Sequence, residues 1–126
     1  MRVRVRLRLG LFNRNAFGTQ FGGSLFAMTD PFYALMVLHH LGSDYIVWDR
    51  MASIEYLTPG RGNVFADFEL SAQVLRDIVR ATQTGERYEP RFSVQVKDAG
   101  DNLVARVERV LYVRRKREVV TTEQQI

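Results

Sequence analysis

The fold depends on residues 15–41, NAFGTQFGGSLFAMTDPFYALMVLHHL. It begins with a glycine-rich turn and continues as a nearly all-apolar segment of helical length, in which Asp30 is the single carboxylate. A helix with apolar residues on every side has no polar stripe to show to water, so the rest of the chain must wrap it. The sequence predicts this helix from Leu25 to Leu41, ending at Gly42 in a left-handed cap.

The flanking sequence predicts strands. Residues 2–9 alternate apolar side chains with four arginines, which is typical of a half-buried strand. Four further runs rich in alternating, β-branched or aromatic residues follow the helix: 44–58, 63–70, 87–97 and 102–114. Turns at 59–62 and 98–101 keep most connections short, as antiparallel strands require. Residues 71–82 have no clean period; a strand continued through a bulge is preferred here over a short helix with Ser71 as its N-cap.

This order predicts an α+β fold in which one curved antiparallel sheet wraps one long central helix. A sheet covers the helix on three sides only, so we expect a second copy of the chain to cover the fourth. Arg109 is the exception to the pattern, because it falls on the apolar face of the last strand. A bulge or an interface partner would account for it.

Composition narrows the possible functions of the chain. Its 126 residues fit one domain, residues 1–126, with a basic and polar tail from 114 to 126. The absence of cysteine excludes disulfides and thiolate catalysis, and the adjacent His39 and His40 have poor geometry for a metal, so no metal site is expected. No signal peptide is visible, which predicts a cytoplasmic protein. The first strand begins almost at the first residue, so removal of a longer native N-terminus stays open.

Basic residues gather at the two ends of the chain, in residues 2–14 and 114–117, while the body between them is acidic. Such ends are compatible with nucleic acid or phosphate-bearing ligands, or with a solvated strand face and a solubilising tail. The arginine-rich strand lacks the interleaved aromatic residues that stack on bases, so no nucleic-acid partner is expected. Arg61 and the 114–117 cluster are either solvated or contacts for the phosphates of a ligand.

The glycine turn resembles the signature of hotdog-fold thioesterases, of the phenylacetyl-CoA and small acyl-CoA thioesterase branch, at Asn15, Gly18, Thr19, Gly22 and Gly23. The stretch from FGGS (21–24) to Asp30-Pro31 and the following DYIVWD (44–49) also resemble an uncharacterised subgroup of that superfamily. Two further features match the family: Asp30 lies at its acidic position, and residues 56–59 (YLTP) resemble the end of one of its strands. This strand end fixes the register of the preceding residues, so that Asp49 falls at the family's second polar position in the active site. The departures are Phe21, where the family has histidine, and Asp49, where it has Ser or Thr.

The resemblance implies hydrolysis of acyl-CoA or acyl carrier protein thioesters, with coenzyme A as part of the substrate and no other cofactor. Asp30 would act as general base or nucleophile, while the Gly22 backbone N–H polarises the carbonyl and Asn15 orients the water. Gly23, Phe21 and Asp49 would contact the substrate. In the family the acid and the glycine turn come from different subunits, which implies a homodimer and allows a tetramer.

Simpler structural interpretations remain open for these residues. Asp30 before Pro31 is also a helix N-cap followed by a first-turn proline. Asn15 and the two glycines can be plain turn residues, and Asp49 a surface residue or ion-pair partner. The departures at Phe21 and Asp49 motivate a second hypothesis, a non-catalytic acyl-CoA-binding or sensing module. A hotdog dehydratase is disfavoured because no histidine lies in the glycine turn or early helix.

Overall fold

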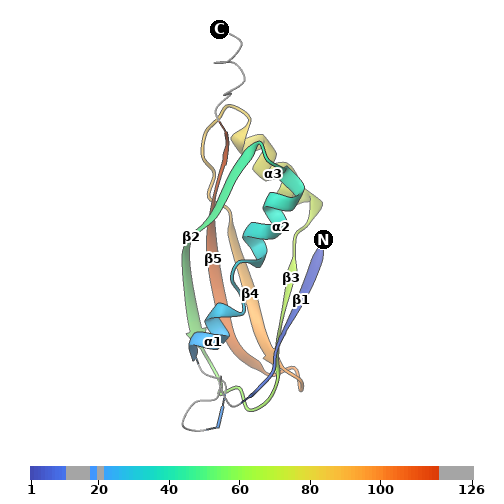
Figure 1. Ribbon diagram of the computed structural model, residues 1–126, viewed down its shortest axis with the longest axis vertical. Helices are drawn as coiled ribbons and strands as arrows, with labels where there is room; N and C mark the ends of the chain where they lie inside the picture. The colour runs from blue at the N-terminus through green and yellow to red at the C-terminus, as the bar shows by residue number, and fades with distance from the viewer. Residues whose placement is uncertain (11–17, 20–21, 117–126) are drawn as a thin grey trace.

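The computed structural model describes residues 1–10, 18–19 and 22–116. Its elements run along the chain in this order: β1 (Arg2–Leu7), α1 (Gly22–Ala27), α2 (Phe32–Leu41), β2 (Tyr45–Tyr56), β3 (Val64–Glu69), α3 (Ala72–Thr82), β4 (Arg91–Asp98) and β5 (Leu103–Arg115). The five strands form one sheet in the order β1-β3-β4-β5-β2, and all neighbours are antiparallel. Helices α1 and α2 lie along one face of this sheet, and α3 lies at one end (Figure 1). The predicted sheet around a helical segment is confirmed.

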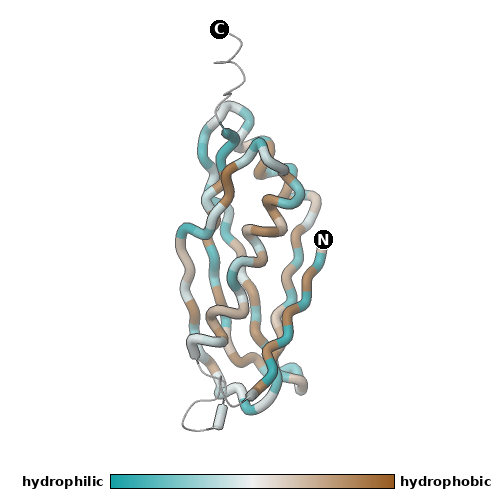
Figure 2. The backbone as a smooth tube through the Cα atoms, in the orientation of Figure 1, coloured by the Kyte–Doolittle hydropathy of each residue, from teal (hydrophilic) through white to brown (hydrophobic). Residues whose placement is uncertain are grey.

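Alternation along the strands separates the buried and exposed faces of the sheet. In β1 the apolar side chains are half-buried against the core and the arginines are exposed, which Figure 2 shows as alternating colours. Arg2 lies 3.7 Å from Glu69 and Arg4 lies 3.5 Å from Asp67, both acids on the neighbouring strand β3. Exposed pairs of this kind stabilise little. They place acidic side chains of β3 beside two of the arginines of β1.

The helical segment is broken between α1 and α2, where the sequence predicted one continuous helix from Leu25 to Leu41. Residues 28–31 form turns between α1 and α2. Proline has no backbone N–H to donate to the preceding turn, and the Thr29 hydroxyl donates to the Phe26 carbonyl at 2.8 Å, which fixes the turn instead. The cap at Gly42 is confirmed: its φ is +82° and its N–H donates to the Leu38 carbonyl at 2.8 Å.

One side of α2 is uncovered in the single chain. Tyr33, Met36 and Val37 are buried in the core against the sheet, but the side chains of Leu35 and Leu38 are 53% and 37% exposed. The expectation that this helix is buried on every side is therefore wrong for one chain. The exposed leucines lie on the side of α2 that the sheet leaves uncovered, where we expect a second copy of the chain.

Residues 71–82 form a helix, which corrects the preferred prediction of a continued strand. The Ser71 hydroxyl accepts a hydrogen bond from the Val74 N–H at 3.2 Å, so the cap named in the alternative is the one observed. Ile78 and Thr82 are buried and lie four residues apart, which is one side of a helix.

The last strand runs slightly further than predicted. β5 ends at Arg115, one residue beyond the predicted strand and inside the segment 114–126 that was predicted to be a tail. Within the described ranges no helix is long and apolar enough to cross a membrane.

Replacing Ser71 by alanine is expected to lower the free energy of unfolding by about 1 kcal/mol, because the Val74 N–H loses its acceptor. Urea denaturation followed by circular dichroism measures the change. Ser93→Ala, at an exposed position in β4, is the matched control and should change stability by less than about 0.5 kcal/mol. Equal losses in the two variants would show that the cap contributes nothing.

Candidate active site

A buried arginine from β5 holds the turn between α1 and α2. Arg109 is only 4% exposed, and its Nη2 donates to the Thr29 hydroxyl at 2.8 Å and to the Phe26 carbonyl at 3.2 Å. Its Nε donates to the same hydroxyl at 3.2 Å, and the guanidinium carbon lies 5.2 Å from the centre of the Phe26 ring. A planar guanidinium with several fixed donors suits such a position, because its Nε and Nη2 reach the hydroxyl and the carbonyl together. The charge of Arg109 is therefore fixed in place beside the turn that carries Asp30.

Two carboxylates from different elements approach the remaining nitrogen of this guanidinium. Nη1 of Arg109 lies 3.9 Å from Oδ1 of Asp30 and 3.7 Å from Oδ1 of Asp49. Asp30 follows α1, whereas Asp49 lies on β2 opposite Leu111, next to a register shift in the ladder with β5. The structure thus brings together Asp30 and Asp49, which lie 19 residues apart in the sequence, around one positive charge.

The two acids differ in their surroundings. The Asp30 side chain is 54% exposed, so about half of it is open to solvent. The Asp49 side chain is 20% exposed, and its Oδ1 is buried without a hydrogen bond from the described residues. A buried carboxylate oxygen without a donor is uncommon in proteins and marks a place for a water or ligand donor.

Burial raises the pKa of Asp49 above its ordinary value, the neighbouring Asp30 carboxyl raises it further, and the positive charge of Arg109 opposes both. In its protonated form Asp49 can donate a hydrogen bond to the Asp30 carboxylate, and pairs of carboxyl groups that can share a proton occur in acid–base sites.

This pKa direction predicts a pH-dependent effect of Asp49→Asn. The folded chain binds the Asp49 proton more tightly than the unfolded chain, whose aspartate pKa is about 3.9. The stability that this group contributes is therefore lost as the pH rises through its raised pKa. We expect Asp49→Asn, relative to wild type, to be more stable at pH 7 than at pH 4 in urea denaturation. Asp67→Asn, on the exposed face of β3, is the control; an Asp49→Asn difference that is independent of pH would contradict the assignment.

Asp30 does not cap a helix in this structure. The N-cap position of α2 is Pro31, and no side chain accepts a hydrogen bond from its first turn. The alternative interpretation of Asp30 as a helix N-cap is therefore wrong, and its nearest charged partner in the described chain is Arg109.

The two glycines of the predicted site begin α1. Gly22 and Gly23 are its first two residues, so their N–H groups have no acceptor within the helix. The Tyr56 hydroxyl donates to the Gly22 carbonyl at 3.0 Å, and a Cβ on Gly22 would lie 3.2 Å from the Tyr56 ring. Glycine at this position lets the turn approach the end of β2. Asn15 and Phe21 lie outside the described residues.

Sequence reasoning missed the role of Arg109 and did not name Thr29. The signal for Arg109 was visible, because it interrupts the apolar face of the last strand. Within the described chain its contacts are two carboxylates and a buried hydroxyl from distant parts of the sequence, and an additional interface partner stays a prediction. Asp49 was placed at the site, and the ion-pair alternative for this residue also describes its contact with Arg109.

The chain is similar to proteins of one family and to several solved structures. The family model for a domain of unknown function, DUF4442, matches residues 1–113. A Pseudomonas aeruginosa protein of unknown function, described as a probable thioesterase, superposes with a TM-score of 0.76 at 23% identity over 90% of this chain and 76% of its own. A search of functionally curated proteins finds no match.

Two further solved structures extend this likeness. A Haemophilus influenzae thioesterase has a TM-score of 0.68 at 15% identity over 94% of this chain and 75% of its own. A Streptococcus mutans protein, solved bound to acetyl-CoA, has a TM-score of 0.63 at 19% identity over 93% of this chain and 84% of its own. These similarities confirm the hotdog fold that the sequence predicts, and the resemblance to thioesterases extends over nearly the whole chain.

Proposed function

We propose that this chain, which belongs to the DUF4442 family, hydrolyses the thioester bond of acyl-CoA or of acylated carrier protein. The observation that carries the proposal is the cluster of Asp30, Asp49 and Arg109, in which one buried guanidinium lies within 4 Å of two carboxylates. The hotdog fold, which thioesterases and an acetyl-CoA-bound protein also have, supports acyl thioesters as the substrate class.

In the proposed reaction Asp30 removes a proton from a water molecule as that water attacks the thioester carbonyl. The exposed half of the Asp30 side chain leaves room for the water and the thioester. Asp49, which meets the same guanidinium as Asp30, helps to fix the orientation of Asp30, while its buried Oδ1 is available to the water. Direct attack by the Asp30 carboxylate is the alternative first step; it forms an acyl anhydride on Asp30, which water then hydrolyses to the free acid and the carboxylate. In both cases the carbon–sulfur bond breaks and the leaving thiolate takes up a proton.

A second copy of the chain completes the proposed site. Negative charge on the carbonyl oxygen needs N–H donors, and the first-turn N–H groups of Gly22 and Gly23 of the partner would supply them. Asn15 would orient the water, and Phe21 would line the acyl pocket. The exposed Leu35 and Leu38 of α2 support such a homodimer, because a second copy would remove them from water.

A panel of acetyl-, octanoyl-, palmitoyl- and phenylacetyl-CoA tests the proposal, with release of free coenzyme A as the readout. We expect hydrolysis of at least one member of the panel by wild type, and its loss in Asp30→Ala. Asp67→Ala, which removes an exposed acid from β3, should retain the wild-type rate. Equal rates for wild type and Asp30→Ala would remove Asp30 from the mechanism.

A non-catalytic acyl-CoA-binding module is the second candidate. It is supported by the Streptococcus mutans structure, which holds the thioester acetyl-CoA, and by an aspartate at position 49 where related enzymes carry a hydroxyl side chain. Calorimetric titration distinguishes the two functions: micromolar binding of acyl-CoA without any release of coenzyme A would favour the binding module.

A further inference from the structure

A hollow lies between the end of α2 and the middle of α3, away from the acid cluster. Its volume is about 370 Å³, within the range of small-molecule sites. The residues around it are His40 and Leu41 from the last turn of α2, and Leu75, Arg76, Val79, Arg80 and Gln83 from α3 and its end. The ten residues of α2, about 15 Å of helix, separate this hollow from Asp30.

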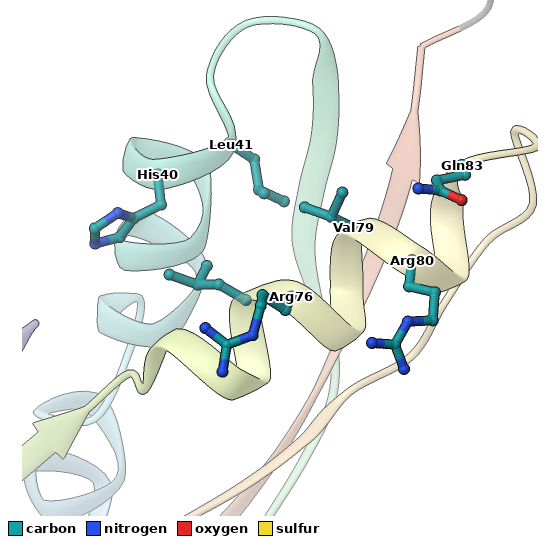
Figure 3. Close-up of a pocket in the computed structure, with 7 residues that line it drawn as sticks. His40, Leu41, Arg76, Val79, Arg80 and Gln83 are labelled. Carbon is teal, nitrogen blue, oxygen red and sulfur yellow. The ribbon is translucent and has the colours of Figure 1, made fainter.

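The polar part of the lining is basic. Arg76 and Arg80 lie four residues apart on α3, and Figure 3 shows their side chains extending from the same side of the helix. Arg76 uses one nitrogen to donate to Gln73 at 2.7 Å, and Arg80 makes no ion pair or hydrogen bond within the described part of the chain. Gln73 also donates to Asp77 at 2.8 Å. No carboxylate lines the hollow, so its guanidinium donors are available to an anion.

The remaining lining is apolar. Leu41 and Leu75 pack against the core, and Val79 is 37% exposed. Figure 3 shows Leu41 and Val79 pointing toward each other where the two helices meet. An inorganic anion would bind the arginines alone and leave this apolar surface in water. A ligand with both a charged head and an apolar chain would satisfy both parts of the lining.

We propose that the hollow between α2 and α3 binds a monomeric amphipathic anion, in which a phosphate or carboxylate head meets Arg76 and Arg80 and a short hydrocarbon chain covers Leu41, Leu75 and Val79. The proposal does not depend on thioester hydrolysis, because the hollow shares no residue with the acid cluster.

Calorimetric titration with octyl phosphate, octanoate and inorganic phosphate tests this site. We expect wild type to bind at least one amphiphile with a Kd below about 1 mM, and to bind inorganic phosphate at least tenfold more weakly. Arg80→Gln should weaken amphiphile binding about tenfold, since one charge-assisted contact is lost, and Arg76→Gln with Arg80→Gln should abolish it. Val79→Asp, at an exposed position, should abolish it through charge repulsion and loss of apolar contact.

Arg91→Gln is the matched control, because it removes an equal charge from an exposed position in β4 and should leave amphiphile affinity within twofold of wild type. Absence of saturable binding by wild type would overturn the proposal, as would equal binding by wild type and the double arginine variant. Equal affinity for inorganic phosphate and octyl phosphate would show that the apolar surface takes no part. Binding to vesicles of phosphatidylglycerol without binding to either monomeric amphiphile would assign the surface to a membrane and also overturn it.

Discussion

Replacing Asp30 by asparagine is expected to lower kcat for acyl-CoA hydrolysis by about 10³-fold, because an amide cannot accept the proton of the attacking water. Asparagine keeps the size of the side chain, and Asp30 is half-exposed, so the fold should be unaffected. The KM should change by less than about threefold if chemistry is the slow step, since the amide removes the base and leaves the acyl and coenzyme A contacts in place. Steady-state kinetics on the best substrate of the panel gives both constants.

The control for this variant is Asp67→Asn, which removes an equal charge from the exposed face of the sheet. Its kcat should equal that of wild type. A fall in kcat of less than about tenfold for Asp30→Asn would contradict the role of this carboxylate as the base, because proton transfer by a positioned group usually contributes more.

Replacing Arg109 by methionine is expected to lower the free energy of unfolding by about 3 kcal/mol. Methionine keeps the apolar stem but leaves the mostly buried Asp49 without its counter-charge, and removal of one partner of a buried ion pair commonly costs about 3–5 kcal/mol. The Thr29 hydroxyl and the Phe26 carbonyl also lose a donor. Urea denaturation at pH 7 measures the loss, and Arg91→Met on the exposed face of β4 is the control.

A double-mutant cycle tests the physical reason for this loss. Since the cost comes largely from an unpaired carboxylate, adding Asp49→Asn to Arg109→Met should restore part of the lost stability, about 1 kcal/mol or more. Strictly additive effects of the two substitutions would show that Arg109 and Asp49 are not energetically coupled. Arg109→Lys should be intermediate in stability, because it keeps the charge but lacks the planar fork that reaches Thr29 and Phe26 together.

The sheet could be predicted from sequence because the strands carry their own signal. The alternation of arginine with apolar residues in β1, and of apolar with polar residues in β3 and β5, fixes which face meets the core. The helix α3 was missed although Val74, Leu75 and Ile78 recur at helical spacing, because the polar residues between them were read as the absence of a period. The Ser71 cap was the deciding local feature, and sequence reasoning had considered it as an alternative.

The acid cluster could be predicted only in part. Asp30 was found because it is the single carboxylate in an apolar segment, and Asp49 because the resemblance to hotdog thioesterases fixed the register of β2. The role of Arg109 depends on β5 lying beneath the turn at residues 26–30, more than 75 residues away along the chain. Such a contact follows from the packing of helix on sheet, which local patterns in one sequence do not specify.

The central claim is that Asp30 of one copy acts on a thioester held by the glycine turn of another. Mixing two inactive variants tests it most directly: Asp30→Asn, which lacks the base, and Gly23→Pro, which lacks an N–H donor in the first turn of α1, where a helix tolerates proline. After the two chains are unfolded and refolded together, random pairing should restore about one quarter of the wild-type rate of coenzyme A release, because half of the dimers then contain one intact site. A mixture no more active than the separate variants, with mixed dimers present, would contradict a site shared between two copies.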